Sequence, residues 1–159
     1  MKVHQLVRRQ HLNTTSEEAW RFFCDARNLN ELTPPGLHFR IVPENLAPLH
    51  DGQIIWYEIR LFPGWWQTWI TEICHVVPGS CFVDNQVSGP YTLWHHRHAF
   101  EPHPEGGVVM TDTVHYALPF GPLGDLAHAI WVGRQVRDIF DYRARAIARR
   151  FGEGANLKT

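Results

Sequence analysis

Near the N-terminus, the pattern of hydrophobic and polar residues predicts one strand followed by two short helices. Residues 3–12 mix β-branched and polar side chains, as strands do. The segment from Thr15 to Glu18 has the form of a capping box, in which the Thr15 hydroxyl accepts from the backbone N–H of Glu18 and the Glu18 carboxylate bonds back to the backbone of Thr15. A helix begins there and is interrupted at 25–28. A helical turn follows at 29–32, and Thr-Pro-Pro-Gly at 33–36 ends it.

Between residues 37 and 118 the hydrophobic period is two, which predicts strands. Short segments rich in glycine, proline and aspartate separate these strands, as at 50–52 and 78–80. Such short connections join antiparallel neighbours, so the strands predict a meander. The six predicted strands are 37–42, 53–62, 67–77, 81–87, 92–101 and 108–118.

A single long helix is predicted from about residue 122 to residue 151. Pro122 suits a first helical turn, and no proline follows it within this range. At a rise of 1.5 Å per residue the helix would be about 45 Å long, so it must lie across a wide sheet. Opposite charges four residues apart predict two ion pairs, Arg134 with Asp138 and Asp141 with Arg145. The predicted apolar stripe consists of Leu126, Ile130, Gly133, Val136, Phe140, Ala144, Ile147 and Phe151.

The order of elements, β-αα-β6-α, predicts an α+β domain. In this arrangement a curved, antiparallel, seven-stranded sheet wraps around the long C-terminal helix and leaves an internal pocket. A chain of 159 residues fits one such domain. The expected boundaries are 1–152 for the domain and 153–159 for a flexible tail.

Charge and cysteine content narrow the class of protein. Fifteen basic and sixteen acidic residues give a net charge of −1, which offers no general attraction to nucleic acid. No apolar run reaches the roughly 18–20 residues of a membrane span, and no signal-peptide pattern opens the chain. The three cysteines cannot all pair in disulfides, and their spacing is not that of a metal site. They are predicted to be small core residues, as free cysteines often are. The protein is expected to be cytoplasmic and to have no cofactor.

Four stretches carry a resemblance to a known superfamily. They are Leu32-Thr33-Pro34-Pro35, FVDNQVSGPY at 82–91, WHHRHAF at 94–100 and DTVHYALPFG at 112–121. With the element order, they make the chain similar to the START-like superfamily, which is also called SRPBCC and includes the polyketide cyclases, lipid-transport proteins and birch-pollen allergens. The resemblance is strongest to a bacterial ligand-binding branch without a settled activity. It implies the helix-grip fold and an internal pocket for a small hydrophobic or amphipathic ligand.

Strand alternation places an unusual mixture of side chains on the inward face of the predicted sheet. Trp94 and Phe100 mark that face of strand 92–101, so His95 and Arg97 are expected to face solvent. An inward carboxylate needs a nearby donor, which predicts a network of aspartates and histidines. The predicted ligand-binding residues are Asp84, Gln86, Trp94, His96, His98, Phe100, Asp112, Tyr116, Trp69 and Gly133.

The sequence leaves open what this network does. It could fix the register of the strands, or it could anchor a mid-sized, partly apolar molecule in the pocket. His96 and His98, two residues apart on one strand face, could bind a metal with Asp112 as the carboxylate ligand. The same three residues could instead supply acid–base catalysis of the cyclase, dehydratase or hydrolase type.

Surface features leave open a further alternative, a protein-interaction module with a homodimer or a neighbouring enzyme as partner. Trp65 and Trp66 lie in a hairpin and cannot both face one core. Gly133 has no side chain, so the middle of the long helix could leave room for a ligand or for a bulky strand residue such as Trp94. The arginines at 143, 145, 149 and 150 are predicted to form the solvated face of the helix.

Overall fold

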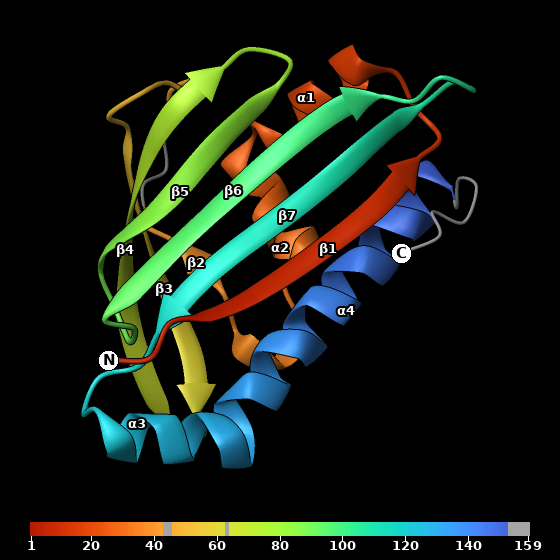
Figure 1. The fold of residues 1–159 in the computed structure, drawn as a ribbon. Coiled ribbons are helices and arrows are strands. Elements are labelled where there is room, and N and C mark those ends of the chain that lie inside the picture. Colours follow the sequence, from red (N-terminus) through yellow and green to blue (C-terminus); the bar gives the residue numbers. More distant parts are fainter. Residues whose placement is uncertain (43–45, 63, 153–159) are drawn as a thin grey trace.

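The computed structural model describes residues 1–42, 46–62 and 64–152. Within them seven antiparallel strands form one sheet, in the order β1-β7-β6-β5-β4-β3-β2. The sheet curves around the helices, which lie on one of its faces (Figure 1). This is the predicted helix-grip architecture. The strands are β1 (His4–Leu12), β2 (Arg40–Ile41), β3 (Ile54–Phe62), β4 (Trp65–Val77), β5 (Cys81–Ser88), β6 (Leu93–Pro102) and β7 (Val108–Ala117).

The two short helices after β1 form as the sequence predicts, with one difference at their start. The Thr15 hydroxyl accepts from the backbone N–H of Glu18 at 3.2 Å, as in a capping box. The Glu18 carboxylate, however, accepts from the Thr14 hydroxyl at 2.6 Å, so the return bond to the backbone was wrongly predicted. The helical segments are α1 (Ser16–Phe23), the 3-10 turn η1 (Ala26–Asn28), α2 (Leu29–Leu32) and the 3-10 turn η2 (Pro35–Leu37).

The first predicted strand of the meander is much shorter than expected. Leu37 belongs to η2, and His38 ends that turn with φ 45°, a left-handed conformation that interrupts the regular extended backbone of a strand. Arg40 and Ile41 pair with β3 at the edge of the sheet, and the backbone N–H of Val42 donates to Trp56 O at 3.1 Å. The prediction of a strand over 37–42 was therefore correct in place and wrong in length.

The C-terminal helix is helical throughout its predicted range but not uniform. It consists of α3 (Pro122–Ala127), the π-helical turn η3 (His128–Val132) and α4 (Gly133–Phe151). The helix axis changes direction at η3, and α3 lies beyond the ends of the strands (Figure 1). Leu126 and Ile130 are consequently 56% and 73% exposed, so the buried stripe does not extend to them as predicted.

Two apolar clusters fill the space between the sheet and the helices. One joins α1 to the C-terminal end of α4 and includes Phe23, Phe100 and Ile147. The other lies toward the start of α4 and includes Tyr116 and Phe140. Along β6, His96 and His98 come between Trp94, which packs on the second cluster, and Phe100 of the first. The polar residues of the sheet are thus enclosed by apolar packing on both sides.

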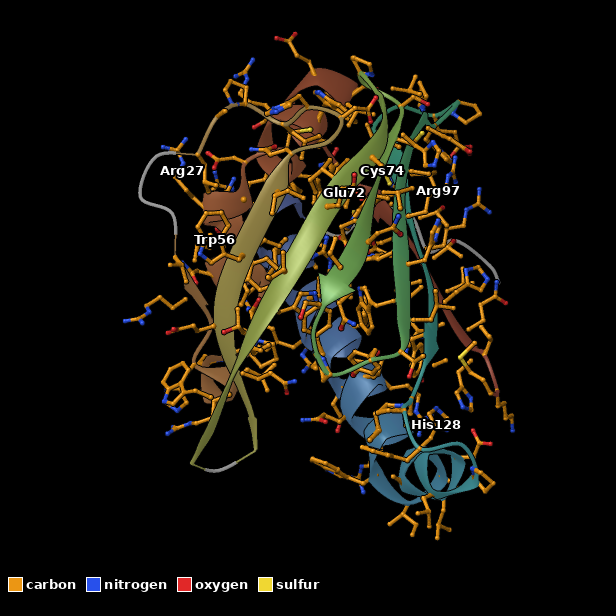
Figure 2. The ribbon with its side chains drawn as sticks, turned by 90° about the vertical axis from the view of Figure 1, so that its left-hand side faces the viewer. Arg27, Trp56, Glu72, Cys74, Arg97 and His128 are labelled. Carbon is orange, nitrogen blue, oxygen red and sulfur yellow. The ribbon has the colours of Figure 1, made fainter. Side chains whose placement is uncertain are left out.

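The outer face of the sheet carries the residues expected there. Arg97 is exposed, and Figure 2 shows it on the face opposite α4, together with Glu72 and Cys74. Trp66 is 50% exposed and has the Arg60 guanidinium 5.6 Å from its ring centroid, whereas the Trp65 side chain lies outside the described residues.

Other sequence expectations have mixed outcomes. Arg134 pairs with Asp138 at 3.9 Å as predicted, but Asp141 accepts from Arg8 of β1 at 2.8 Å instead of pairing with Arg145. The predicted tail, 153–159, lies outside the described residues. Within the described ranges no helix has the length and apolarity that crossing a bilayer demands.

Gly124 provides a test of how α3 is attached to the end of β7. A Cβ atom at this buried position would lie 2.1 Å from the carbonyl oxygen of Pro119, so the backbone itself would have to move. We expect Gly124→Ala to lower the free energy of unfolding by about 1–3 kcal/mol, the usual cost of overpacking. Urea denaturation measures this, and Gly36→Ala is the control because its Cβ meets nothing within 4 Å. Equal stabilities for the two variants would contradict the packing described for α3.

Candidate functional site

Three neighbouring strands bring two aspartates and two histidines together on the concave face. Asp84 of β5 lies opposite His96 of β6, and His98 of β6 lies opposite Asp112 of β7. Alternate residues of a strand point to the same face, so this register gathers all four side chains. The predicted convergence of Asp84, His96, His98 and Asp112 is therefore what the structure shows.

The two imidazole rings lie between the two carboxylates, so that every ring nitrogen faces an aspartate oxygen. On one side Asp84 Oδ2 lies 2.9 Å from His98 Nε2 and 3.3 Å from His96 Nδ1. On the other side Asp112 Oδ1 lies 3.0 Å from His96 Nε2 and 2.9 Å from His98 Nδ1. The ring centroids are 3.8 Å apart. We call these four residues, with Arg143, the Asp–His–Arg cluster.

Arg143 of α4 is the fifth member, and the sequence interpretation missed it. Its Nε donates to Asp112 Oδ2 at 3.3 Å, and its Nη2 lies 3.5 Å from His98 Nδ1. The side chain is buried, so placing Arg143 on the solvated face of the helix was wrong. The signal was present: Arg143 follows Phe140 by three residues and precedes Ile147 by four, which is the spacing of the buried stripe.

The charges of the cluster stabilise one another in a site that excludes most water. Burial by itself would raise the pKa of Asp84 and Asp112, but the positive charges of His96 and Arg143 and the hydrogen bonds from both histidines hold the two pKa values well below the usual range. Burial alone would lower the pKa of His96, yet the carboxylates of Asp84 and Asp112 raise it to about 9. At neutral pH the cluster thus contains two carboxylates, a guanidinium and an imidazolium.

A cavity of about 60 Å³ lies next to the cluster, and Asp84, His98 and Arg143 are among the residues that line it. That volume holds only a few water molecules, which is far smaller than the pocket for a mid-sized ligand that the sequence predicts. An open groove of about 520 Å³ lies outside it. The two spaces share four lining residues, namely Asp25, Ala26, Leu49 and Ile55.

The remaining predicted ligand-binding residues lie away from this cavity. Gln86 closes the β5–β6 hairpin, because its amide donates to Tyr91 O at 2.6 Å and accepts from Tyr91 N at 3.2 Å. Trp69 and Trp94 pack edge to face with ring centroids 5.1 Å apart. Phe100 belongs to the apolar cluster of α1. These contacts are structural, and the ligand-binding role predicted for these residues stays a prediction.

Tyr116 and Gly133 lie near the other end of the sheet, around His128 of the π-helical turn. The Tyr116 hydroxyl is 2.9 Å from His128 Nε2, and the His128 ring stacks on His4 with centroids 3.4 Å apart. A Cβ on Gly133 would lie 2.8 Å from the His128 ring. Gly133 therefore makes room for a residue of its own helix, and not for Trp94 as the sequence suggested. Figure 2 labels His128 at this end of the molecule.

The stacked histidines predict an acid-sensitive contact. Burial first, and then nearby positive groups including Lys2, lower the pKa of both His4 and His128 below 6.5. As the pH falls, these histidines are therefore protonated at a higher pH in the unfolded chain than in the folded protein. Their contribution to the free energy of unfolding is complete above pH 6.5 and is lost as the pH falls below it. We expect the melting temperature to fall less between pH 7.5 and 5.5 in His128→Gln than in the wild type, whereas the exposed His50→Gln behaves as wild type. The same fall in all three proteins would contradict the assignment.

Comparison with solved structures identifies the fold. Protein CV1439 from Chromobacterium violaceum matches with TM-score 0.70 and 13% identity, covering 94% of this chain and 99% of that one. Major latex-like protein 151 from Panax ginseng matches with TM-score 0.66 and 10% identity over 94% and 97%. The ZhuI aromatase/cyclase from Streptomyces sp. R1128 matches with TM-score 0.64 and 12% identity over 94% and 96%.

Sequence comparison adds no assignment: no protein-family model matches the chain, and no curated protein does. The identities to the solved structures are too low to transfer an activity. Together with the observed topology, the structural similarity shows that this chain has the helix-grip fold.

Proposed function

We propose that the protein binds a small molecule in the cavity beside the Asp–His–Arg cluster. The observation that supports this most is the composition of the cavity wall. Asp84, His98 and Arg143 line it together with a few other polar side chains, Asp25, Asn28, Tyr57 and Thr71, whereas the rest of the lining is apolar and includes Phe22, Phe82 and residues of α2. A few convergent polar groups in an apolar lining are typical of small-molecule sites.

The exposed fractions of the side chains in the cluster indicate which group would contact the ligand. The Asp84 side chain is 20% exposed, whereas those of His98 and Arg143 are 4% and 9% exposed. The carboxylate of Asp84 has a low pKa and accepts hydrogen bonds. The favoured ligand therefore carries a hydroxyl or amine donor near Asp84 and an apolar body.

The apolar body needs more room than the inner cavity contains. The side chains of Ala26, Leu49 and Ile55 border both the cavity and the outer groove. A mid-sized ligand would occupy both spaces after Leu49 moves aside. This supports a route from solvent to the cluster that passes between α1 and the segment 46–49.

Acid–base catalysis at the same cavity is the second candidate function. The observation that favours it is His98, which lines the cavity and has a carboxylate oxygen 2.9 Å from each ring nitrogen. Such a contact can position an imidazole for proton transfer. One protein with the same fold is an aromatase/cyclase, which supports chemistry in the interior without specifying it.

A bulky side chain at Ala26 tests the binding site. Ala26 borders both spaces, so Ala26→Phe should fill their junction and weaken binding at least tenfold for any compound found by thermal-shift screening of lipids, aromatics and isoprenoids. Ala129→Phe is the control, because Ala129 is exposed on η3 and should leave binding unchanged. Native mass spectrometry gives the stoichiometry, which should be one to one.

Three outcomes would decide against simple binding at this cavity. Equal affinity in Ala26→Phe and the wild type would place the ligand elsewhere. A compound recovered from the protein in chemically altered form would select catalysis over binding. Failure of every compound class to raise the melting temperature would contradict the proposal itself.

A further inference from the structure

Three ligating atoms of the Asp–His–Arg cluster converge on one place. His96 Nδ1 and His98 Nε2 both face the same oxygen, Asp84 Oδ2, at 3.3 and 2.9 Å. The three atoms all lie within 4.8 Å of one another. Two imidazole nitrogens and one carboxylate oxygen are a donor set that suits Zn²⁺ or Fe²⁺ and leaves coordination positions open. Metal–ligand bonds of about 2.1 Å place neighbouring ligand atoms roughly 3.0–3.4 Å apart, so little movement is needed.

The opposite nitrogens of the two rings are arranged as they are in metal-bound histidines. A metal-binding histidine usually donates its other N–H to a carboxylate, which fixes the tautomer and aims the ring. Here His96 Nε2 and His98 Nδ1 both contact Asp112 Oδ1, at 3.0 and 2.9 Å. With a proton held on each of these nitrogens, His96 Nδ1 and His98 Nε2 are the atoms left to bind a cation.

Arg143 decides which of the two aspartates would bind the metal. Its guanidinium contacts Asp112 at 3.3 Å, and this positive charge repels a cation from the Asp112 side. Asp84 borders the cavity and has the more exposed carboxylate, 20% against 6% for Asp112. Histidine binds a metal as the neutral imidazole. In that state the two carboxylates and the guanidinium sum to −1, so a bound divalent cation changes the charge of the cluster to +1.

We propose that Asp84, His96 and His98 form a binding site for a divalent first-row transition metal, Zn²⁺ or Fe²⁺. Asp112 and Arg143 are positioning residues that hold the two rings. The sequence interpretation named Asp112 as the carboxylate ligand, and the geometry points to Asp84 instead. Asp84 and His98 line the cavity, so an oxygen atom of a molecule bound there could reach the metal. The metal site does not depend on the proposed small-molecule function.

Calorimetric titration of EDTA-treated protein with Zn²⁺ alone tests this proposal. We expect one ion per chain, with a rise in melting temperature on binding. Asp84→Asn should weaken binding at least tenfold. Asp112→Asn should weaken it roughly ten- to a hundredfold at unchanged stoichiometry, as expected for a residue that positions metal ligands. His50→Gln, which removes an exposed histidine, is the matched control and should bind as wild type.

A second measurement keeps the test decisive if an aspartate variant does not fold. In wild-type protein loaded with Co²⁺, paramagnetic shifts in the proton NMR spectrum should fall on the rings of His96 and His98. Shifts on exposed histidines, no binding of Zn²⁺, or unchanged affinity in folded Asp84→Asn would each overturn the metal site. Organic ligands that bind the EDTA-treated protein while Zn²⁺ does not would overturn the metal site and leave the proposed function standing.

Discussion

Replacement of Arg143 by methionine should lower the free energy of unfolding by about 3–5 kcal/mol. The substitution keeps most of the apolar stem but removes the charge that pairs with Asp112 at 3.3 Å in a buried site. Removing one partner of a buried ion pair is strongly destabilising because the other charge is left without compensation. Urea denaturation followed by circular dichroism measures the change.

The control for this prediction is Arg145→Met. Arg145 lies two residues along the same helix and is exposed, so the same chemical change should alter stability by less than about 0.5 kcal/mol. A second comparison isolates the pair itself. The double variant Asp112→Leu with Arg143→Met should cost clearly less than the sum of the single changes, because neither charge is then left alone. Additive losses would show that Arg143 and Asp112 do not interact.

Asp112→Asn should have the second large effect, with a loss of roughly 3 kcal/mol. The Asp112 carboxylate faces His96 Nε2, His98 Nδ1 and Arg143 Nε, and the latter two residues also lie close to one another. An asparagine presents one amide oxygen and one N–H₂ donor, so at least one of these three groups would meet a donor. It also leaves the buried Arg143 guanidinium without the carboxylate that it contacts directly.

Asp141→Asn provides the same chemical change in a pair of similar geometry and different burial. Asp141 accepts from Arg8 at 2.8 Å, but their side chains are 47% and 35% exposed. Pairs in such partly solvated positions are worth about 0–1 kcal/mol. If Asp112→Asn were as mild as Asp141→Asn, the buried cluster would not have the energetic role assigned to it.

The fold was largely predictable from the sequence because each element has a local signal. Period-two alternation located β3 to β7 within a few residues, and the same alternation placed Asp84, His96, His98 and Asp112 on one face. Strand pairing then depended only on short connections between antiparallel neighbours. The convergence of two carboxylates and two imidazoles therefore follows from strand alternation and neighbour pairing alone.

Arg143 was missed because sequence rules assign a charged residue to solvent unless its partner is known. Its position satisfies the stripe as well as Ala144 does, and the choice between them depends on Asp112, which lies on a strand far away in the sequence. Tertiary pairing of this kind has no local signature. The indication of such a pair is the buried carboxylate itself, because its charge must be compensated by a partner.

The bend in the C-terminal helix and the size of the cavity were unpredictable for a different reason. A π-helical turn changes hydrogen bonding from i→i−4 to i→i−5, and the run from His128 to Val132 contains no residue that forces it. Cavity volume depends on how closely Phe22, Phe82 and Leu49 approach one another, which only the packed structure determines.

The most direct test of the interior site is the electron density next to Asp84 in crystals of the protein purified without treatment and after soaking with a compound from the thermal-shift screen. We predict density larger than water in the cavity, in contact with the Asp84 carboxylate and reaching past Leu49 into the outer groove. A cavity that holds only water in both crystals, with the Asp–His–Arg cluster intact, would contradict a binding function for this site.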